Sequence, residues 1–258
     1  MIGIIGGSGV YDVSLLNNVE DIDVYTPYGK PSAPVTVGDY NGKKIAFIPR
    51  HGKTHSIAPH KVNYRANIWA LKQLGVKVIL APCAVGSMKE ELKAGDFVFV
   101  DQFIDRTNAR ETTFYDKDKV CHISVADPCC KRIKNLLIKT ADELKLSYHK
   151  TGTYICINGP RFSTKAESLL YQKWDADVVG MTMVPESVLA REAEICYVSI
   201  AMITDYDCWK EHAVSMKDII ETVGKNIEKS KKLLMNVISQ IDVAEECSCH
   251  NALDGAIA

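Results

Sequence analysis

Short apolar segments alternate along this chain with longer segments of helical periodicity. The clearest of them, residues 195–203, consists almost entirely of apolar and β-branched side chains, as a buried strand does. Similar but shorter segments span residues 2–5, 76–81, 97–100, 153–157 and 177–180. The alternation predicts a single α/β domain, a central β-sheet flanked by helices, over residues 1–242. Residues 243–258 follow as a C-terminal tail that contains a Cys-x-Cys pair.

A hairpin signal makes the predicted sheet mixed. Asn41-Gly42 lies between two strand-like segments, residues 34–40 and 44–49, and this dipeptide favours a tight antiparallel turn. Helices are expected at residues 62–74, 128–146, 164–174 and 185–193, and a long one from Ser215, with Asp218 completing a capping box.

Composition excludes several classes of protein. The 258 residues are 47% hydrophobic and carry a formal net charge of -1, which gives no reason to expect a nucleic-acid partner. No apolar run reaches the ~18 residues of a membrane span, and Met1 leads directly into a strand without a basic leader. We expect a cytoplasmic protein that binds no membrane.

The first strand leads into a glycine-rich turn. Residues 3–9 read GIIGGSG, and their backbone N–H groups can approach an anion. A dinucleotide fingerprint is ruled out because Asp12 occupies its last glycine position. The turn favours free phosphate, with Ser8 as a hydroxyl donor, although a tight turn that simply requires glycine gives the same pattern.

Arg50 and His51 end the strand at 44–49, where a guanidinium beside an imidazole can hold an oxyanion. With His55 and His60 they also suggest a metal, but no neighbouring cysteine or acid completes a ligand set.

Two carboxylates follow the strand at 195–203. Asp205 and Asp207 are two residues apart beside two aromatic residues, and such a pair shifts its own pKa values apart, so that one acid can stay protonated. The alternative is a polar loop with two solvated aspartates.

Other predicted strand ends carry small, polar or aromatic residues, as ligand clefts of open α/β sheets do. We interpret Pro82–Ser87 as a loop leaving the strand at 76–81, and Cys83 as a packed small residue more readily than a nucleophile. Residues 158–163 and 180–183 follow two further strands.

Together these segments resemble the purine nucleoside phosphorylase family, in particular its 5'-methylthioadenosine phosphorylases. The resemblance covers residues 2–241 and is carried by GIIGGSG (3–9), RHG (50–52), KVNYRANIWALK (61–72), DQFIDRT (101–107), GPRFS (159–163), MTMVPE (181–186) and TDYDCWKEH (204–212). It implies attack of phosphate on C1' of a ribose while a purine leaves, without a cofactor or catalytic metal.

The resemblance also implies a role for each matching residue. Phosphate would be held by Ser8, Arg50, His51, Ala84 and Thr182, and the nucleoside by Phe162, Ser163, Met181, Asp205, Asp207 and His122. Asp205 and Asp207 would be catalytic and would face purine N7 and the 6-amino group, so adenine is the predicted base. His122 would come from a neighbouring subunit, which implies a homo-oligomer, a trimer or a hexamer.

The sequence departs from the family at two positions, and it leaves two other functions open. Cys83 stands where a threonine hydroxyl is expected for phosphate, and Gly180 replaces a larger polar residue, which would loosen the ribose pocket. A broader phosphorylase for adenosine, inosine or guanosine, or a noncatalytic purine binder, would also account for the sequence.

The tail contains Cys247, Cys249 and His250. Related enzymes from hot environments carry intrachain disulfides and a Cys-x-Cys pair, so the resemblance makes a disulfide one interpretation. Free thiols are another. The three side chains also fall one ligand short of a closed zinc set.

Overall fold

The computed structural model describes residues 1–6, 15–210 and 216–258. Its helices are α1 (Tyr64–Gln73), α2 (Lys131–Glu143), α3 (Lys165–Lys173), α4 (Met183–Glu192) and α5 (Met216–Gln240). The strands are β1 (Ile2–Gly6), β2 (Asn17–Ile22), β3 (Val35–Tyr40), β4 (Lys43–Pro49), β5 (Val78–Ser87), β6 (Phe97–Phe99), β7 (Gln102–Arg106), β8 (Tyr148–His149), β9 (Thr153–Ile157), β10 (Val178–Gly180) and β11 (Cys196–Asp205). The predicted α/β class is confirmed.

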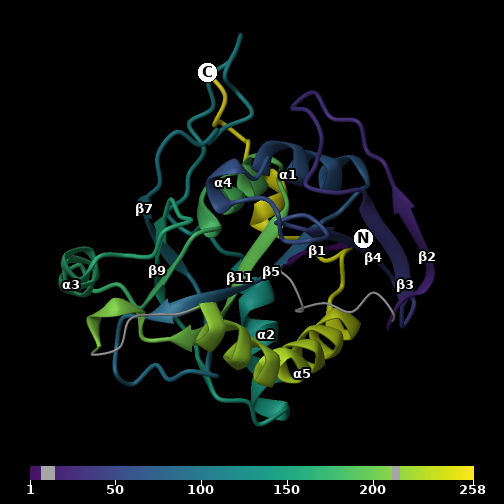
Figure 1. Ribbon diagram of the computed structural model, residues 1–258. Helices are drawn as coiled ribbons and strands as arrows, with labels where there is room; N and C mark the ends of the chain where they lie inside the picture. The colour runs from purple at the N-terminus through teal and green to yellow at the C-terminus, as the bar shows by residue number, and fades with distance from the viewer. Residues whose placement is uncertain (7–14, 211–215) are drawn as a thin grey trace.

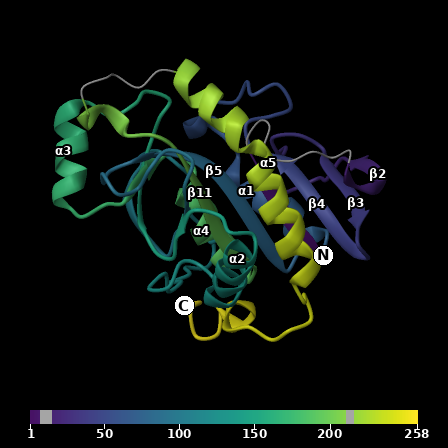
Figure 2. The same cartoon turned by 90° about the horizontal axis from the view of Figure 1, so that it is seen from below.

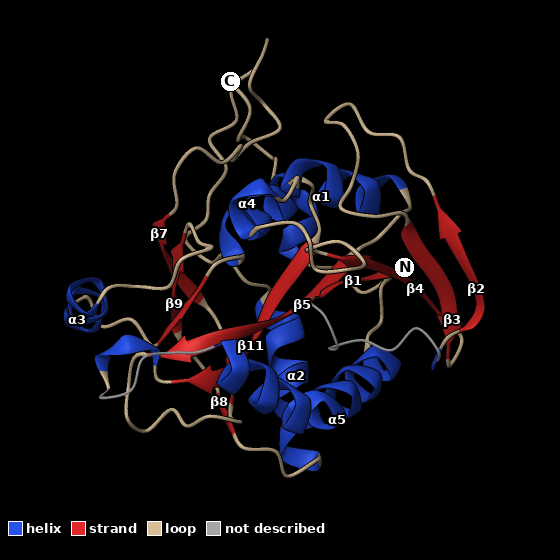
Figure 3. Ribbon diagram, viewed as in Figure 1, coloured by secondary structure: helices blue, strands red, loops and turns tan. Residues whose placement is uncertain are grey.

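The sheet lies between two layers of helices (Figures 1 and 3). Helices α1 and α4 cover one face, where Ile68 and Leu189 are buried, and α2 and α5 cover the other, where Leu137 and Val237 are buried. Figure 2 shows α2 and α5 from below. Since both faces are covered, the central strands are apolar on both sides, and this explains their continuous apolar sequences.

The hairpin prediction is confirmed. Strands β3 and β4 pair antiparallel, and the turn between them places Asn41 at φ 46° and Gly42 at φ 74°. Both angles are in the left-handed region, which Asn and Gly tolerate best. Strand β1 pairs parallel with β4, so the sheet is mixed, as predicted.

Strand β5 is longer than predicted, and this is a correction. Residues 82–87, interpreted as a loop, continue the strand to Ser87 and pair parallel with β11 up to Gly86. Small side chains at Ala84 and Gly86 weaken the strand signal in the sequence, whereas the backbone pairing with β11 depends on no side chain.

The other edge of β5 changes partners partway along. Its first half pairs with β1 up to Leu80, and its last two residues, Gly86 and Ser87, pair with β10. Between them, residues 81–85 have no strand partner on this edge within the described chain. The sheet therefore splits here, beside the end of β1.

Three strands had no clear signal, β2, β7 and the two-residue β8 (Tyr148–His149). Strand β2 is an edge strand with almost fully exposed residues, so it lacks an apolar alternation, and β7 pairs parallel with β9 through a polar sequence. The predicted cap of α5, Ser215, lies outside the described residues. No helix in the described part of the chain is long and apolar enough to cross a membrane.

The tail packs on the domain. It forms a short 3₁₀ helix, Ser248–Asn251, in which Cys249 is buried, and Ile257 bridges to Cys121. The nine cysteines all lie within the described residues, and each is a free thiol in the structure.

Candidate active site

The split edge of β5 exposes one residue of an otherwise buried strand. Ala84 is open to solvent, while Cys83 and Val85 on either side are buried. A backbone exposed between two separating strands can reach a ligand that a continuous sheet would exclude. The side chains that the sequence predicted for phosphate can be located relative to this point.

Arg50 lies at the end of β4 and is fully buried beside the split. Its Nε and Nη2 donate to the two carboxylate oxygens of Glu186, at 2.7 and 2.9 Å, and Nη2 also donates to Ile5 O at 3.0 Å. Tyr197 donates its hydroxyl to the same carboxylate at 3.0 Å. Nη1 makes a single long contact, 3.5 Å, with Pro82 O in the described structure. The guanidinium is thus held by Glu186 with one nitrogen left largely unsatisfied.

His51 follows Arg50 and is also buried. Its Nδ1 lies 2.9 Å from Ile57 O, and since a carbonyl only accepts, Nδ1 carries the proton and Nε2 is an acceptor. Burial, and then the neighbouring Arg50 charge, lower the pKa of His51 to about 4. The imidazole is neutral at pH 7 and suits the hydroxyl of a hydrogen phosphate. Among the described residues, His51, His55 and His60 do not form a group of side chains close enough to hold a metal ion together. The metal interpretation of these histidines therefore gains no support.

Thr182 and Met181 lie between β10 and α4. Thr182 is the N-cap residue of α4 and is buried, yet its hydroxyl makes no capping hydrogen bond. Met181 packs on Gly159, where a Cβ would come 2.5 Å from its sulfur. The two residues thus sit side by side just before α4, whose first turn is irregular because Val184 is non-helical at φ -111° and is followed by Pro185.

Gly180 does not leave an empty space, contrary to our expectation of a looser pocket. A Cβ at this position would lie 2.0 Å from the hydroxyl oxygen of Tyr154, which is fully buried. Tyr154 also accepts a hydrogen bond from the Thr182 backbone N–H at 3.3 Å. The tyrosine fills the volume that a larger residue at position 180 would take.

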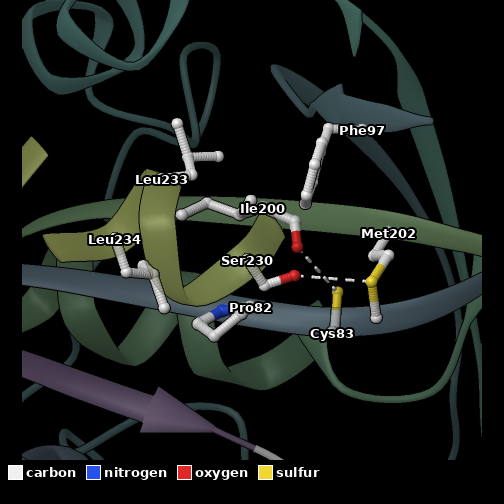
Figure 4. A pocket seen from close by; sticks show the side chains of 8 residues that line it. All are labelled: Pro82, Cys83, Phe97, Ile200, Met202, Ser230, Leu233 and Leu234. Atoms are coloured by element: carbon white, nitrogen blue, oxygen red, sulfur yellow. Dashed lines mark hydrogen bonds between the residues drawn. The ribbon is translucent and has the colours of Figure 1, made fainter. Parts of the chain in front are cut away.

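Cys83 is packed, as predicted. Its sulfur lies 3.6 Å from Ser199 Oγ, and burial raises the pKa of the thiol, which makes it a poor nucleophile. The nearby Ser87 hydroxyl cannot replace the missing threonine hydroxyl as a donor to phosphate, because its own proton is donated to Lys89 O at 2.6 Å. A small apolar cavity beside Cys83 runs between β5, β11 and α5 (Figure 4), with Met202 and Ser230 on its wall. Neither aspartate lines this cavity, so it is not the substrate site.

Asp205 is the last residue of β11, after a register shift against β5. Its Oδ2 accepts from the Thr204 hydroxyl at 2.7 Å and its Oδ1 from the Asp207 N–H at 2.8 Å. Asp207 is buried and adopts φ 50°, a left-handed conformation that aspartate tolerates. A Cβ at Gly86 would come 3.1 Å from Asp205 Oδ1, so the strand opposite needs glycine here. The two aspartates form one rigid unit, not a solvated loop.

Ser163 approaches the aspartates through Cys208, the residue after Asp207. Its thiol donates to Ser163 O at 3.1 Å, and Trp209 donates its indole N–H to Ser87 O at 2.7 Å. Phe162 is half-buried. The Ser163 hydroxyl is buried without a partner among the described residues. A buried hydroxyl of this kind is a ready contact for a ligand.

His122 lies elsewhere on the chain. It is exposed, and its backbone N–H donates to Ala256 O at 2.8 Å, next to the C-terminus. Ser8 lies outside the described residues, as do Glu211 and His212.

Sequence reasoning missed three supporting side chains. Glu186 holds Arg50, Tyr154 fills the space at Gly180, and Arg110 donates to Asn158 O at 2.8 Å and to Val184 O, joining the loops before Phe162 and after Met181. Glu186 could have been found, because an acid in the apolar segment MTMVPE needs a buried cation.

The chain is similar to known proteins over nearly its whole length. A family model described as the phosphorylase superfamily matches residues 1–239. The chain belongs to this superfamily. The S-methyl-5'-thioadenosine phosphorylase of Nitrosopumilus maritimus is 53% identical over 255 residues, 99% of this chain and 97% of that protein. That of Pyrococcus abyssi is 54% identical over 252 residues, 98% of this chain and 97% of that protein.

Solved phosphorylase structures share the fold. Methylthioadenosine phosphorylase from Schistosoma mansoni, in complex with adenine, superposes with a TM-score of 0.94 at 39% identity and covers 99% of this chain and 98% of its own. A methylthioadenosine phosphorylase from an Antarctic soil metagenomic library superposes with a TM-score of 0.94 at 42% identity. The match covers 100% of this chain and 92% of that one.

Proposed function

We propose that this protein is a pentosyltransferase that phosphorolyses 5'-methylthioadenosine to adenine and 5-methylthioribose 1-phosphate. The observation that carries the proposal is the split in the sheet, which brings the exposed Ala84, the buried Arg50 and the aspartates opposite Gly86 to the same strand, β5. Relatives that share about half of the residues over the full length carry the corresponding name.

Phosphate would bind at the split. Arg50 Nη1, the N–H group at Ala84 and the Thr182 hydroxyl supply donors, with Ser8 as a further one from the glycine-rich turn. His51 Nε2 accepts the hydroxyl of a hydrogen phosphate. The charged oxygens of the phosphate would then accept hydrogen bonds from Arg50 and the other donors. These contacts would direct one of the charged oxygens at C1'.

The purine would bind on the other side, between Phe162 and the two aspartates. As an oxygen of phosphate forms its bond to C1', the bond from C1' to purine N9 breaks and its electron pair goes to the base. Protonation of N7 neutralises that charge. Asp205 already accepts two hydrogen bonds, which suits an ionised acceptor for the 6-amino group, and Asp207 is left to deliver the proton.

The nucleoside site would be completed by a second copy of the chain. His122 is exposed and is flanked by apolar residues that are also exposed, Val120 at 53% and Ile257 at 40%. An exposed apolar patch next to the C-terminus is typical of a subunit contact. We infer a cytoplasmic homo-oligomer, a trimer or a hexamer, in which His122 faces the 5'-methylthio group of a neighbouring subunit's substrate.

The test is the release of adenine from methylthioadenosine with and without inorganic phosphate. We expect release only with phosphate, together with stoichiometric 5-methylthioribose 1-phosphate. Release at the same rate in phosphate-free buffer would show a hydrolase. Adenosine and inosine, measured in parallel, define the preference at the 5' position and at the base.

A further inference from the structure

Four cysteine sulfurs from three separate segments meet where the tail packs on the domain. Cys130 precedes α2, Cys196 begins β11, and Cys247 and Cys249 belong to the tail. The four Sγ atoms all lie within 4.8 Å of one another, and those of Cys130 and Cys247 are 3.6 Å apart. The two cysteines of the tail are two ligands short of a four-ligand set, and the fold supplies the other two.

The spacing is that of ligands around one cation. A tetrahedral zinc ion with Zn–S bonds of ~2.3 Å places its sulfurs ~3.8 Å apart. Two disulfides would instead group the sulfurs into pairs bonded at ~2.05 Å. In the structure the four thiols are mutual neighbours and none is paired.

Two arginines and a histidine lie beside the cluster. Arg191 Nη1 donates to Cys249 Sγ at 3.5 Å, Arg132 Nη2 approaches Cys196 Sγ at 4.0 Å, and His250 Nε2 lies 3.6 Å from the same sulfur. The Nε–H groups of both arginines are buried without an acceptor among the described residues. Four thiolates around a divalent cation carry a net charge of about -2, which these donors would offset.

We propose that Cys130, Cys196, Cys247 and Cys249 bind one soft divalent cation of the zinc class. Four protein ligands close the coordination shell, so the site is structural and takes no part in phosphorolysis. Binding releases the thiol protons and fastens the tail to α2 and β11. Arg132 supports the same junction, since it also donates to Asp242 O and to Glu245 in the tail.

The experiment measures metal and thiols on the same sample. The full-length protein is purified without chelator, its zinc content is measured by elemental mass spectrometry, and its thiols are titrated in denaturant with chelator but no reductant. We expect one zinc per chain and all nine thiols. Five thiols, nine minus the four of the cluster, would show two disulfides and overturn the proposal. Nine thiols without bound metal would also overturn it.

A variant pair locates the metal. Cys247→Ser removes a ligand from the tail, where the domain itself should still fold, and we expect zinc to fall well below one per chain. Cys129→Ser is the matched control, since Cys129 is the buried neighbour of Cys130 but lies outside the cluster. It should keep one zinc. Cobalt added to the metal-free parent should give the visible bands of a tetrahedral thiolate site, and their absence would contradict the geometry.

Discussion

The two ends of β11 carry two clusters of opposite character. At its first residue, Cys196 joins Cys130 and the two thiols of the tail, while at its last residue Asp205 stands with Asp207 beside the split in the sheet. The thiols are buried or half-buried. At the other end, Arg50 Nη1 makes one long contact, the Ser163 hydroxyl has no partner in the described structure, and Ala84 is exposed. Donors left unsatisfied on a rigid frame indicate a place where substrate binds, whereas a closed ligand set indicates one that stabilises the fold.

Of the substitutions at the two ends of β11, Asp207→Asn should have the largest effect on catalysis. The amide cannot protonate purine N7, so we expect kcat for methylthioadenosine to fall by about 10²–10⁴-fold. Steady-state phosphorolysis measures the loss, and thermal unfolding serves as a control that should show little change. Turnover close to that of the parent would exclude Asp207 as the acid.

Glu186→Gln tests the frame that holds phosphate. The pair with Arg50 is nearly fully buried, at 2% and 1% side-chain exposure, and its loss leaves a buried guanidinium uncompensated, which typically costs about 3–5 kcal/mol. We expect a lower free energy of unfolding and a raised KM for phosphate. Tyr197→Phe is the matched control, because it removes a hydrogen bond to Glu186 and leaves the ion pair intact.

The sequence predicted the helices, the apolar strands and the two carboxylates that follow residues 195–203, because these depend on local patterns, but it missed β2, β7 and β8, which are polar or very short. Apolar periodicity located the strands, and Asn41-Gly42 determined one antiparallel pair. The sequence could not predict the split beside β5, because the split depends on where the neighbouring strands β1 and β10 end. Nor could it join Cys130 and Cys196 to the tail, because no local pattern encodes contacts between such distant residues.

His51 gives the substrate end a pH dependence. Its pKa is about 4 in the folded protein against about 6.5 when unfolded, so the unfolded state binds the proton first as the pH falls. The contribution of His51 to stability is therefore complete above pH 6.5 and is lost between pH 6.5 and 4, by at most about 3 kcal/mol.

Denaturant unfolding of the parent and of His51→Gln across this range, without phosphate, isolates the effect. The glutamine variant should lose less stability between pH 6.5 and 4 than the parent. Parallel pH profiles for the two proteins would mean that His51 is not held neutral by burial and Arg50.

Asp205→Asn should change the choice of base. The Asn oxygen can still accept from the Asp207 N–H, and its amide would meet a 6-oxo group where a carboxylate repels it. We expect the ratio of inosine to adenosine turnover to rise about tenfold or more, which corresponds to about 1.4 kcal/mol or more. An unchanged ratio would assign the base contact to Asp207 instead.

The smallest effect on catalysis should come from the cysteine end. Cys249→Ser removes a thiol that lies at the opposite end of β11 from Asp205, and its neighbour Arg191 is not among the residues proposed to bind substrate. We expect kcat/KM at 25 °C within about twofold of the parent, because independent sites contribute additively. A chelator should lower the Tm of the parent by about 4 °C or more but leave that of Cys249→Ser unchanged, since the variant has no complete site to lose. A chelator that inactivated the parent at 25 °C without unfolding it would instead show that the two ends of β11 are coupled.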